Sequence, residues 1–144
     1  PRSALVVKVF APEPYYVIAA HLISDDGDWA EQKRVESIEQ LFAFIQDRGL
    51  APVILMGDLN ANRDSLTLNC LRQKGFFVIN DLDPAANSWP ADHPEILLDY
   101  IAVYPAESAE CLEYYVVDDD HTSDHRPVYG KLRFHSRECC NPVE

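Results

Sequence analysis

The stretch PVILMGDLN, residues 52–60, is a short and almost wholly apolar run that ends abruptly in Gly-Asp. A run of this length and composition is typical of a β-strand that is buried on both faces of its sheet. Neighbouring segments of the chain are therefore expected to supply the layers that cover this strand.

Regular patterns on both sides of this strand supply those layers. Apolar residues from Val35 to Ile45 recur at three- and four-residue spacing, which predicts a helix over residues 29–48 with one buried face. Gly49 is a suitable end for this helix, and a second helix is predicted before Gly75. The second helix covers residues 65–74, and β-rich runs predict strands at 3–10, 15–24, 76–80, 96–104, 111–118 and 127–134.

The order of these elements predicts an α+β domain over residues 1–135. Two prolines separate the first two strands, so we expect an antiparallel pair, and the other strands complete a mixed sheet with helices on one face. The opposite face of such a sheet needs a partner layer. Residues 81–95, with three prolines, are expected to form a long loop, and residues 136–144 a loose tail.

Composition narrows the class of protein. The hydrophobic fraction of 47% in 144 residues excludes intrinsic disorder, and no apolar run approaches the roughly 20 residues of a membrane span. The net charge is −12 and the 12 basic residues are scattered, which disfavours tight, non-specific binding to nucleic acid. No targeting peptide is visible at the N-terminus.

The four cysteines lack the spacing of a zinc site. Adjacent cysteines rarely form a disulfide with each other because the geometry is strained. We therefore expect free thiols in a reducing compartment, and a cytoplasmic location. The four cysteines are Cys70, Cys111, Cys139 and Cys140.

Polar side chains punctuate the predicted strands, and each lies at or just beyond a strand. α/β enzymes gather their chemistry at such strand ends. These residues are His21, Asp58, Asn60, Asp99, Asp124 and His125.

Asp99 is the most informative of them because it lies inside the apolar run ILLDYIAV, where an unpaired carboxylate costs several kcal/mol. A structural salt bridge is one explanation. The sequence offers another partner in His125, at the end of a different strand. A carboxylate bonded to one ring nitrogen fixes the tautomer and raises the basicity of the other nitrogen, which then activates a water molecule.

The remaining acidic and amide groups suit a hard cation. Mg²⁺ prefers one or two carboxylates together with water and substrate oxygens, and Asp124 fits that requirement. Asp58 and Asn60 are two residues apart, so an extended backbone places both on the same side. Asp58 then acts on a proton or on metal-bound water, and the Asn60 amide donates to a phosphoryl oxygen.

Each of these motifs has a simpler explanation. Gly-Asp-Leu-Asn is also a common strand-to-turn ending, and a histidine on an apolar strand such as His21 is often a satisfied core residue. The acidic run from Asp118 to Asp120 reads as a solvated loop. For Trp89, the functional interpretation is that its ring stacks on a base or sugar of the substrate. The simpler one is that the ring packs the loop at 81–95 against the protein. The combination of motifs, in this order, favours a catalytic site.

The combination resembles the endonuclease/exonuclease/phosphatase superfamily, whose fold is a DNase I-like α/β/β/α sandwich. The similar motifs are the histidine strand AAHLIS, the Gly-Asp-x-Asn sequence MGDLNAN, the Asp-Tyr strand LLDYIAV and the Ser-Asp-His sequence TSDHRPV. The resemblance extends over about residues 2–134. It implies that the chain is the C-terminal half of such a domain, supplying roughly one mixed sheet and its covering helices.

The resemblance also implies a mechanism, in which water attacks a phosphoester in line with Mg²⁺ or Mn²⁺ as cofactor. His125 would be the general base, or would polarise the phosphate, and Asp99 would orient it. Asp124 and Asp58 would bind the metal. Asp58 and Asn60 would position the nucleophile and the phosphate, His21 would bind phosphate or assist the leaving group, and Trp89 would contact substrate.

One part of the family pattern is missing. In the family, an N-terminal half supplies an Asn and a Glu that binds metal, and Glu13, between two prolines, does not replace that Glu. We therefore expect that activity needs an N-terminal half, or that a second copy covers the open face of the sheet. A non-catalytic remnant that associates through that face is the alternative function. Small phosphoesters or lipid headgroups are expected substrates ahead of nucleic acid.

Overall fold

The computed structural model describes residues 3–10 and 12–135. The predicted tail at 136–144, with Cys139 and Cys140, lies outside these residues, while Cys70 and Cys111 are free thiols as expected. No helix in the described ranges is long and apolar enough to cross a membrane. The elements are β1 (Ala4–Phe10), β2 (Pro14–Ala20), α1 (Asp28–Asp47), β3 (Val53–Asp58), α2 (Leu66–Gln73), β4 (Phe77–Val78), η1 (Ile79–Leu82), β5 (Asp99–Tyr104), η2 (Ala106–Ser108), β6 (Ala109–Val116) and β7 (Val128–Phe134).

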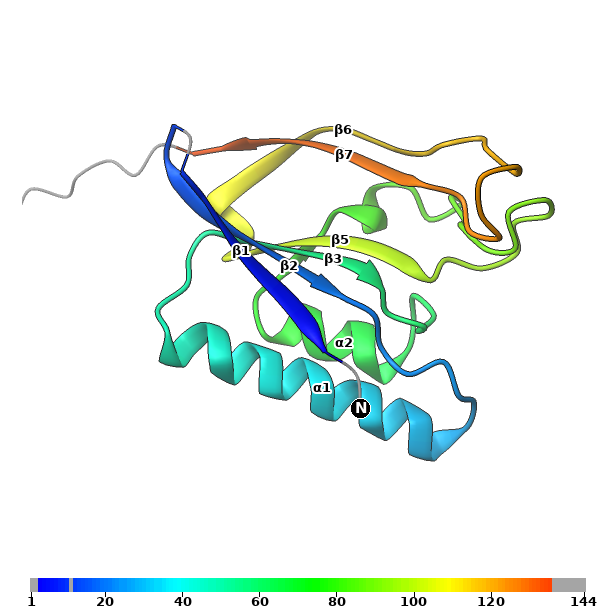
Figure 1. The fold of residues 1–144 in the computed structure, drawn as a ribbon, viewed down its shortest axis with the longest axis horizontal. Coiled ribbons are helices and arrows are strands. Elements are labelled where there is room, and N and C mark those ends of the chain that lie inside the picture. Colours follow the sequence, from blue (N-terminus) through cyan, green and yellow to red (C-terminus); the bar gives the residue numbers. More distant parts are fainter. Residues whose placement is uncertain (1–2, 11, 136–144) are drawn as a thin grey trace, which may run out of the picture.

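The prediction of a mixed sheet is confirmed for five strands, in the order β1-β2-β3-β5-β4. β1 and β2 form the expected antiparallel pair, β2 and β3 are parallel, and β3 and β5 are antiparallel. The crossover between the parallel strands runs through α1, which lies with α2 on one face of the sheet (Figure 1). Ile38 and Ile45 of α1 are fully covered there, as their spacing predicted.

The last two strands differ from the prediction. They were expected in the mixed sheet, but β6 and β7 pair only with each other as a separate antiparallel sheet. This ribbon lies on the side of β5 opposite the helices (Figure 1). Gly130 of β7 packs so closely on Ile79 and Ile101 that a Cβ there would lie 2.5 Å from the Ile79 side chain.

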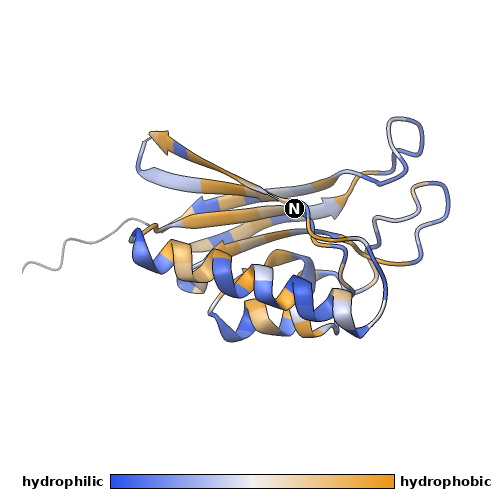
Figure 2. Ribbon diagram, turned by 60° about the horizontal axis from the view of Figure 1, so that its bottom comes forward, coloured by the Kyte–Doolittle hydropathy of each residue, from blue (hydrophilic) through white to orange (hydrophobic). Residues whose placement is uncertain are grey.

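The second face of the large sheet is therefore only partly covered. Figure 2 shows hydrophobic residues concentrated along the strands, while the loops at the right of the molecule are mostly hydrophilic. The edge strand β1 exposes Leu5 (65%) and Val7 (44%), which are two residues apart and so lie on the same face of the strand. The expected open apolar surface is thus present, and it is concentrated on β1.

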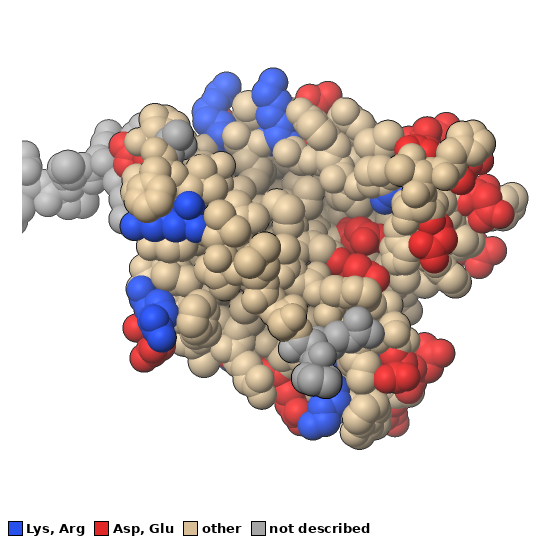
Figure 3. All heavy atoms as spheres, in the orientation of Figure 1, with Lys and Arg blue, Asp and Glu red and all other residues tan. Residues whose placement is uncertain are grey.

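Sheet topology brings the polar residues to one end of the molecule. Because β2 and β3 are parallel, their C-terminal ends lie side by side, and His21 and Asp58 are found there. β5 runs the opposite way and begins at Asp99, whose partner in the β3 register is Asp58. On the face shown in Figure 3, acidic side chains gather toward this end and basic ones mostly toward the other.

Candidate active site

Asp99 and His125 form the central contact of the site. The Nδ1 atom of His125 lies 2.7 Å from Oδ2 of Asp99, and both side chains are about three-quarters buried. The partner that the sequence suggested for Asp99 is therefore present. With Asp99 ionised, the Nδ1 atom of His125 carries the ring proton and donates a hydrogen bond to Asp99. The Nε2 atom of the neutral ring is then free to accept a proton.

Asp58 lies next to this pair on the adjoining strand. Its Oδ1 accepts a hydrogen bond from the backbone N–H of Asn60 at 2.8 Å, and its Oδ2 lies 3.4 Å from Nε2 of His21. The His21 side chain is 57% exposed. The alternative of a satisfied core histidine is therefore wrong.

Asn60 serves the turn as well as the site. Among the described residues it is the one non-glycine with positive φ, at 48°, a conformation that asparagine tolerates. Its Nδ2 donates to the carbonyl of Leu22 at 3.1 Å and to Oδ2 of Asp58 at 3.2 Å. Both amide hydrogens of Asn60 are thus engaged, and the side chain fixes the position of Asp58. For the Asn60 amide to donate to a phosphoryl oxygen, one of these two hydrogen bonds must open.

Asp124 completes the wall of an open depression of about 520 Å³. The depression is lined by all of the predicted residues except Trp89, with Ser24 and Ser123 added. Trp89 lines an adjoining hollow of about 420 Å³, which shares Ser24, Asn60 and His125 with the first. Trp89 is 37% exposed and its backbone pairs with Ile96, so it both packs the loop and faces the hollow.

The other acidic residues among 3–10 and 12–135 stay outside this depression. Asp118 is 89% exposed and pairs with Arg126 at 2.9 Å, as expected for a solvated loop. Glu13 lies in the turn between β1 and β2, beyond the opposite end of β2 from His21. Glu13 therefore takes no part in this depression.

Two ionisable groups of the site have shifted pKa values. Burial raises the pKa of Asp58, and the nearby charge of Asp99 adds to this, while the Asn60 N–H, His125 and His21 oppose it; the result lies above the usual 3.8. Burial lowers the pKa of His125, but the hydrogen bond to Asp99 and the charges of Asp99, Asp58 and Asp124 outweigh burial and raise it above 6.5.

A pH titration checks this balance. Asp99→Asn is expected to lower the pKa of His125, because the hydrogen bond and the largest charge that raise it are removed together. The folded-state pKa lies above the unfolded value, so the contact stabilises the fold fully below pH 6.5 and this contribution is lost as pH rises through the folded pKa. NMR titration of the His125 ring protons in metal-free protein measures the shift, with Asp47→Asn as a distant control. An unchanged His125 pKa in Asp99→Asn would contradict the assignment.

The donor set fits a hard divalent cation. Among the described residues, one ligand atom each from Asp58, Asp99 and His125 lie within 4.8 Å of one another. The His125 Nδ1 atom is already engaged by Asp99, so the remaining donors are carboxylate oxygens and the Nε2 atom of His125, and carboxylate oxygens suit Mg²⁺ or Mn²⁺. Asp124 lines the same depression but is not in this group of three.

Sequence reasoning missed the three serines of the site. Ser24 and Ser123 line the depression, and Ser123 Oγ accepts the backbone N–H of His125 at 3.1 Å. Ser88 Oγ lies 2.7 Å from Oδ2 of Asp99. Ser123 belongs to the Ser-Asp-His sequence, but the resemblance gave the serine itself no role. A lone serine such as Ser24 or Ser88 carries no pattern, and the only signal for Ser88 was its place beside Trp89.

Comparison with solved structures shows which fold this is. An endonuclease/exonuclease/phosphatase family protein from Bacteroides thetaiotaomicron has a TM-score of 0.75 at 22% identity, with 94% of this chain and 56% of that chain covered. One from Beutenbergia cavernae has a TM-score of 0.78 at 22% identity, with 92% and 39% covered. The chain has the endonuclease/exonuclease/phosphatase fold.

The same fold is found in a mannosyl-6-phosphatase from Bacteroides thetaiotaomicron, with a TM-score of 0.65 at 21% identity. There, 84% of this chain and 52% of that chain are covered. The chain thus spans about half the length, or less, of these structures. No protein-family model matches the sequence, and no curated protein matches it either.

Proposed function

We propose that this chain is the C-terminal half, residues 1–135, of a metal-dependent phosphoester hydrolase of the endonuclease/exonuclease/phosphatase superfamily. The observation that carries the proposal is the 2.7 Å contact between His125 Nδ1 and Asp99 Oδ2, placed beside Asp58 at one end of the sheet. The fold supports the assignment to this superfamily, and the Asp99–His125 pair supports hydrolysis as the reaction.

The Asp99–His125 pair supplies the base. Asp99 accepts the Nδ1 proton and stabilises the imidazolium that forms when Nε2 takes a proton from water. The raised pKa of His125 makes it a better base, provided that the pH is high enough to keep it neutral. His125 lines the open depression, so a water molecule and a phosphoester reach it from solvent.

Asp124 and Asp58 are the proposed ligands of Mg²⁺ or Mn²⁺. When bound, the cation would neutralise charge that develops on the phosphoryl oxygens. The largely buried Asp58 carboxylate, with a raised pKa and a carboxylate neighbour, is a group that a cation would favour in its ionised form. Asn60 fixes Asp58, and His21, which is exposed at the rim, would contact phosphate or the leaving group.

A small phosphoester or a lipid headgroup is the proposed substrate class, ahead of nucleic acid. The net charge of −12 opposes a polyanion. The arginines near the site are already engaged: Arg34 by Glu31, and Arg126 by Asp118. Trp89 would stack on a ring of the substrate. A nuclease remains the alternative if an N-terminal half carries a basic groove.

A second candidate function is association without catalysis. The exposed apolar side chains of β1 favour it, since monomers rarely expose contiguous apolar surface. The occupant of this surface would be an N-terminal half or a second copy of the chain. Sedimentation equilibrium separates the cases, because a chain that remains monomeric at high concentration argues against self-association.

Calorimetry tests the metal site. The wild-type chain is expected to bind Mg²⁺ with a millimolar or tighter dissociation constant, and Asp124→Ala and Asp58→Ala to weaken binding by about tenfold or more, which corresponds to about 1.4 kcal/mol. Asp47→Ala is the matched control, because Asp47 is an 80% exposed carboxylate at the end of α1. Absence of Mg²⁺ binding to a folded wild-type chain would show that these residues do not form a metal site by themselves.

A further inference from the structure

Ser88 has a hydroxyl group with all of its hydrogen-bonding capacity used. The side chain is fully buried in the loop that precedes β5. Its Oγ atom accepts the backbone N–H groups of Leu98 and Asp99 at 3.1 and 3.3 Å, and lies 2.7 Å from Oδ2 of Asp99. A serine hydroxyl offers one donor and two acceptor lone pairs. Since both lone pairs are occupied, its single hydrogen is directed at Asp99.

This arrangement fixes the carboxylate that His125 needs. Oδ2 of Asp99 accepts hydrogen bonds from Ser88 Oγ and from His125 Nδ1, each at 2.7 Å. We propose that Ser88 is a positioning residue, which holds Asp99 Oδ2 toward His125 and so keeps the proton on Nδ1. This inference rests on the proposed function of the Asp99–His125 pair, and it extends the catalytic machinery into the loop that precedes β5.

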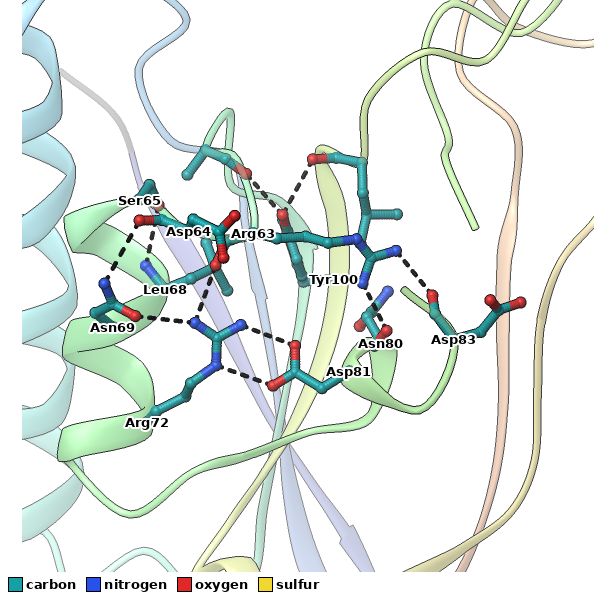
Figure 4. A network of polar contacts seen from close by, with 12 residues as sticks. Arg63, Asp64, Ser65, Leu68, Asn69, Arg72, Asn80, Asp81, Asp83 and Tyr100 are labelled. Carbon is teal, nitrogen blue, oxygen red and sulfur yellow. Dashed lines mark hydrogen bonds and ion pairs between the residues drawn. The ribbon is translucent and has the colours of Figure 1, made fainter. Parts of the chain in front are cut away.

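The loop that carries Ser88 is held on both sides by arginines. Before Ser88, Arg63 donates to the carbonyls of Asn80, at 2.7 Å, and Asp83, at 3.0 Å, and also to that of Ala86. Figure 4 shows the Arg63 guanidinium reaching from the turn before α2 toward Asn80 and Asp83. Arg72 donates to the Arg63 carbonyl at 2.9 Å and forms a two-pronged contact with Asp81.

On the other side of Ser88, Arg126 holds the loop. Its backbone N–H donates to the Ser88 carbonyl at 2.7 Å, and its Nε atom to the Ala91 carbonyl at 2.6 Å. Because Arg126 directly follows His125, the segment with the imidazole and the loop with the hydroxyl are joined by backbone contacts. These contacts thereby fix the relative positions of Ser88, Asp99 and His125.

A purely structural role for Ser88 gives a different expectation. Its two bonds from backbone N–H groups stabilise the beginning of β5, and removing a buried hydroxyl leaves these groups without that partner. A structural role therefore predicts lower stability in Ser88→Ala with the same imidazole tautomer. A positioning role predicts that the tautomer changes as well.

The experiment measures the His125 tautomer by ¹⁵N NMR in metal-free protein, at a pH where the imidazole is neutral. Wild type is expected to hold the Nδ1–H form as the dominant tautomer, and Ser88→Ala to reduce it to a minor form. Ser88→Thr and Ser88→Val have nearly the same shape, so Thr should retain the wild-type tautomer and Val should lose it. Ser108→Ala, which removes a hydroxyl bonded to the Pro105 carbonyl away from the site, is the control.

Retention of the Nδ1–H form in both Ser88→Ala and Ser88→Val would overturn the proposal. If these variants fail to fold, Arg63→Gln replaces them, because Arg63 holds the loop but has no hydrogen bond to Asp99 or His125 among its contacts. Arg63→Gln is expected to lower the Nδ1–H fraction, and an unchanged fraction would overturn the proposal. The tautomer is measured without substrate, so the Ser88 result is readable whether or not this chain hydrolyses a phosphoester by itself.

Discussion

Gly57→Ala is expected to lower the free energy of unfolding by about 3 kcal/mol or more, which is enough to unfold a marginal domain. Gly57 has φ of +135°, and a Cβ built there would lie 2.0 Å from the carbonyl oxygen of Ala20. That oxygen belongs to the backbone of β2, and it has no side-chain torsion by which to move away. The clash is relieved only if β2 and β3 separate at their C-terminal ends.

Urea unfolding followed by circular dichroism measures this loss. Gly49→Ala is the matched control, because Gly49 also has positive φ, at +59°, but no atom lies within 4 Å of its added Cβ. Gly49→Ala should therefore lose only the conformational cost, about 1–2 kcal/mol. Equal losses in the two variants would show that the close approach of β2 and β3 is not what requires glycine at residue 57.

The same close approach explains why the apolar run at 52–60 ends in Gly-Asp. Without a side chain on Gly57, the chain after β2 stays against β3, and the Leu22 N–H donates to the Asp58 carbonyl at 2.9 Å. His21 is thereby kept beside Asp58. A backbone requirement at one residue thus places two candidate site residues together.

Most of the fold follows from local pattern. Three- and four-residue spacing predicted the helix over 29–48, and the structure has Asp28–Asp47. Strand-end position predicted that His21, Asp58 and Asp99 share a site, because β2 and β3 are parallel neighbours and β5 begins beside the end of β3. These predictions depend on periodicity and on sheet edges, and a single sequence contains both kinds of information.

The remaining features depend on contacts between distant segments. Periodicity predicted strands at 111–118 and 127–134 but not that they form a sheet of their own. The choice of partner strand depends on contacts between distant segments, such as the one between Gly130 of β7 and Ile101 of β5. The strand expected from residue 96 begins only at Asp99, because Ile96 pairs with Trp89 in the preceding loop. Ser88 was not found because its role depends on a fold that brings residues 88 and 99 together.

His125→Ala is expected to slow hydrolysis of a phosphoester by about 10²–10⁴-fold, or about 2.7–5.4 kcal/mol of transition-state stabilisation. Alanine removes the group that accepts the proton from water, and no other histidine replaces it: His21 contacts Asp58, at 3.4 Å, and its side chain is 57% exposed. Asp99→Asn should give a smaller loss in the same direction, because the imidazole remains but its tautomer is no longer fixed.

The rate measurement has a matched control within the same loop. His121 is four residues from His125, its side chain is 93% exposed, and it contacts only Asp120, at 3.1 Å, among ion-pair partners in the described chain. His121→Ala removes an identical group and should leave kcat/KM for bis(p-nitrophenyl) phosphate, with Mg²⁺ present, unchanged. Similar losses of kcat/KM in the two variants would mean that a histidine anywhere in this acidic loop contributes to the rate only through its charge. A loss confined to His125→Ala assigns the proton transfer to the imidazole that Asp99 holds.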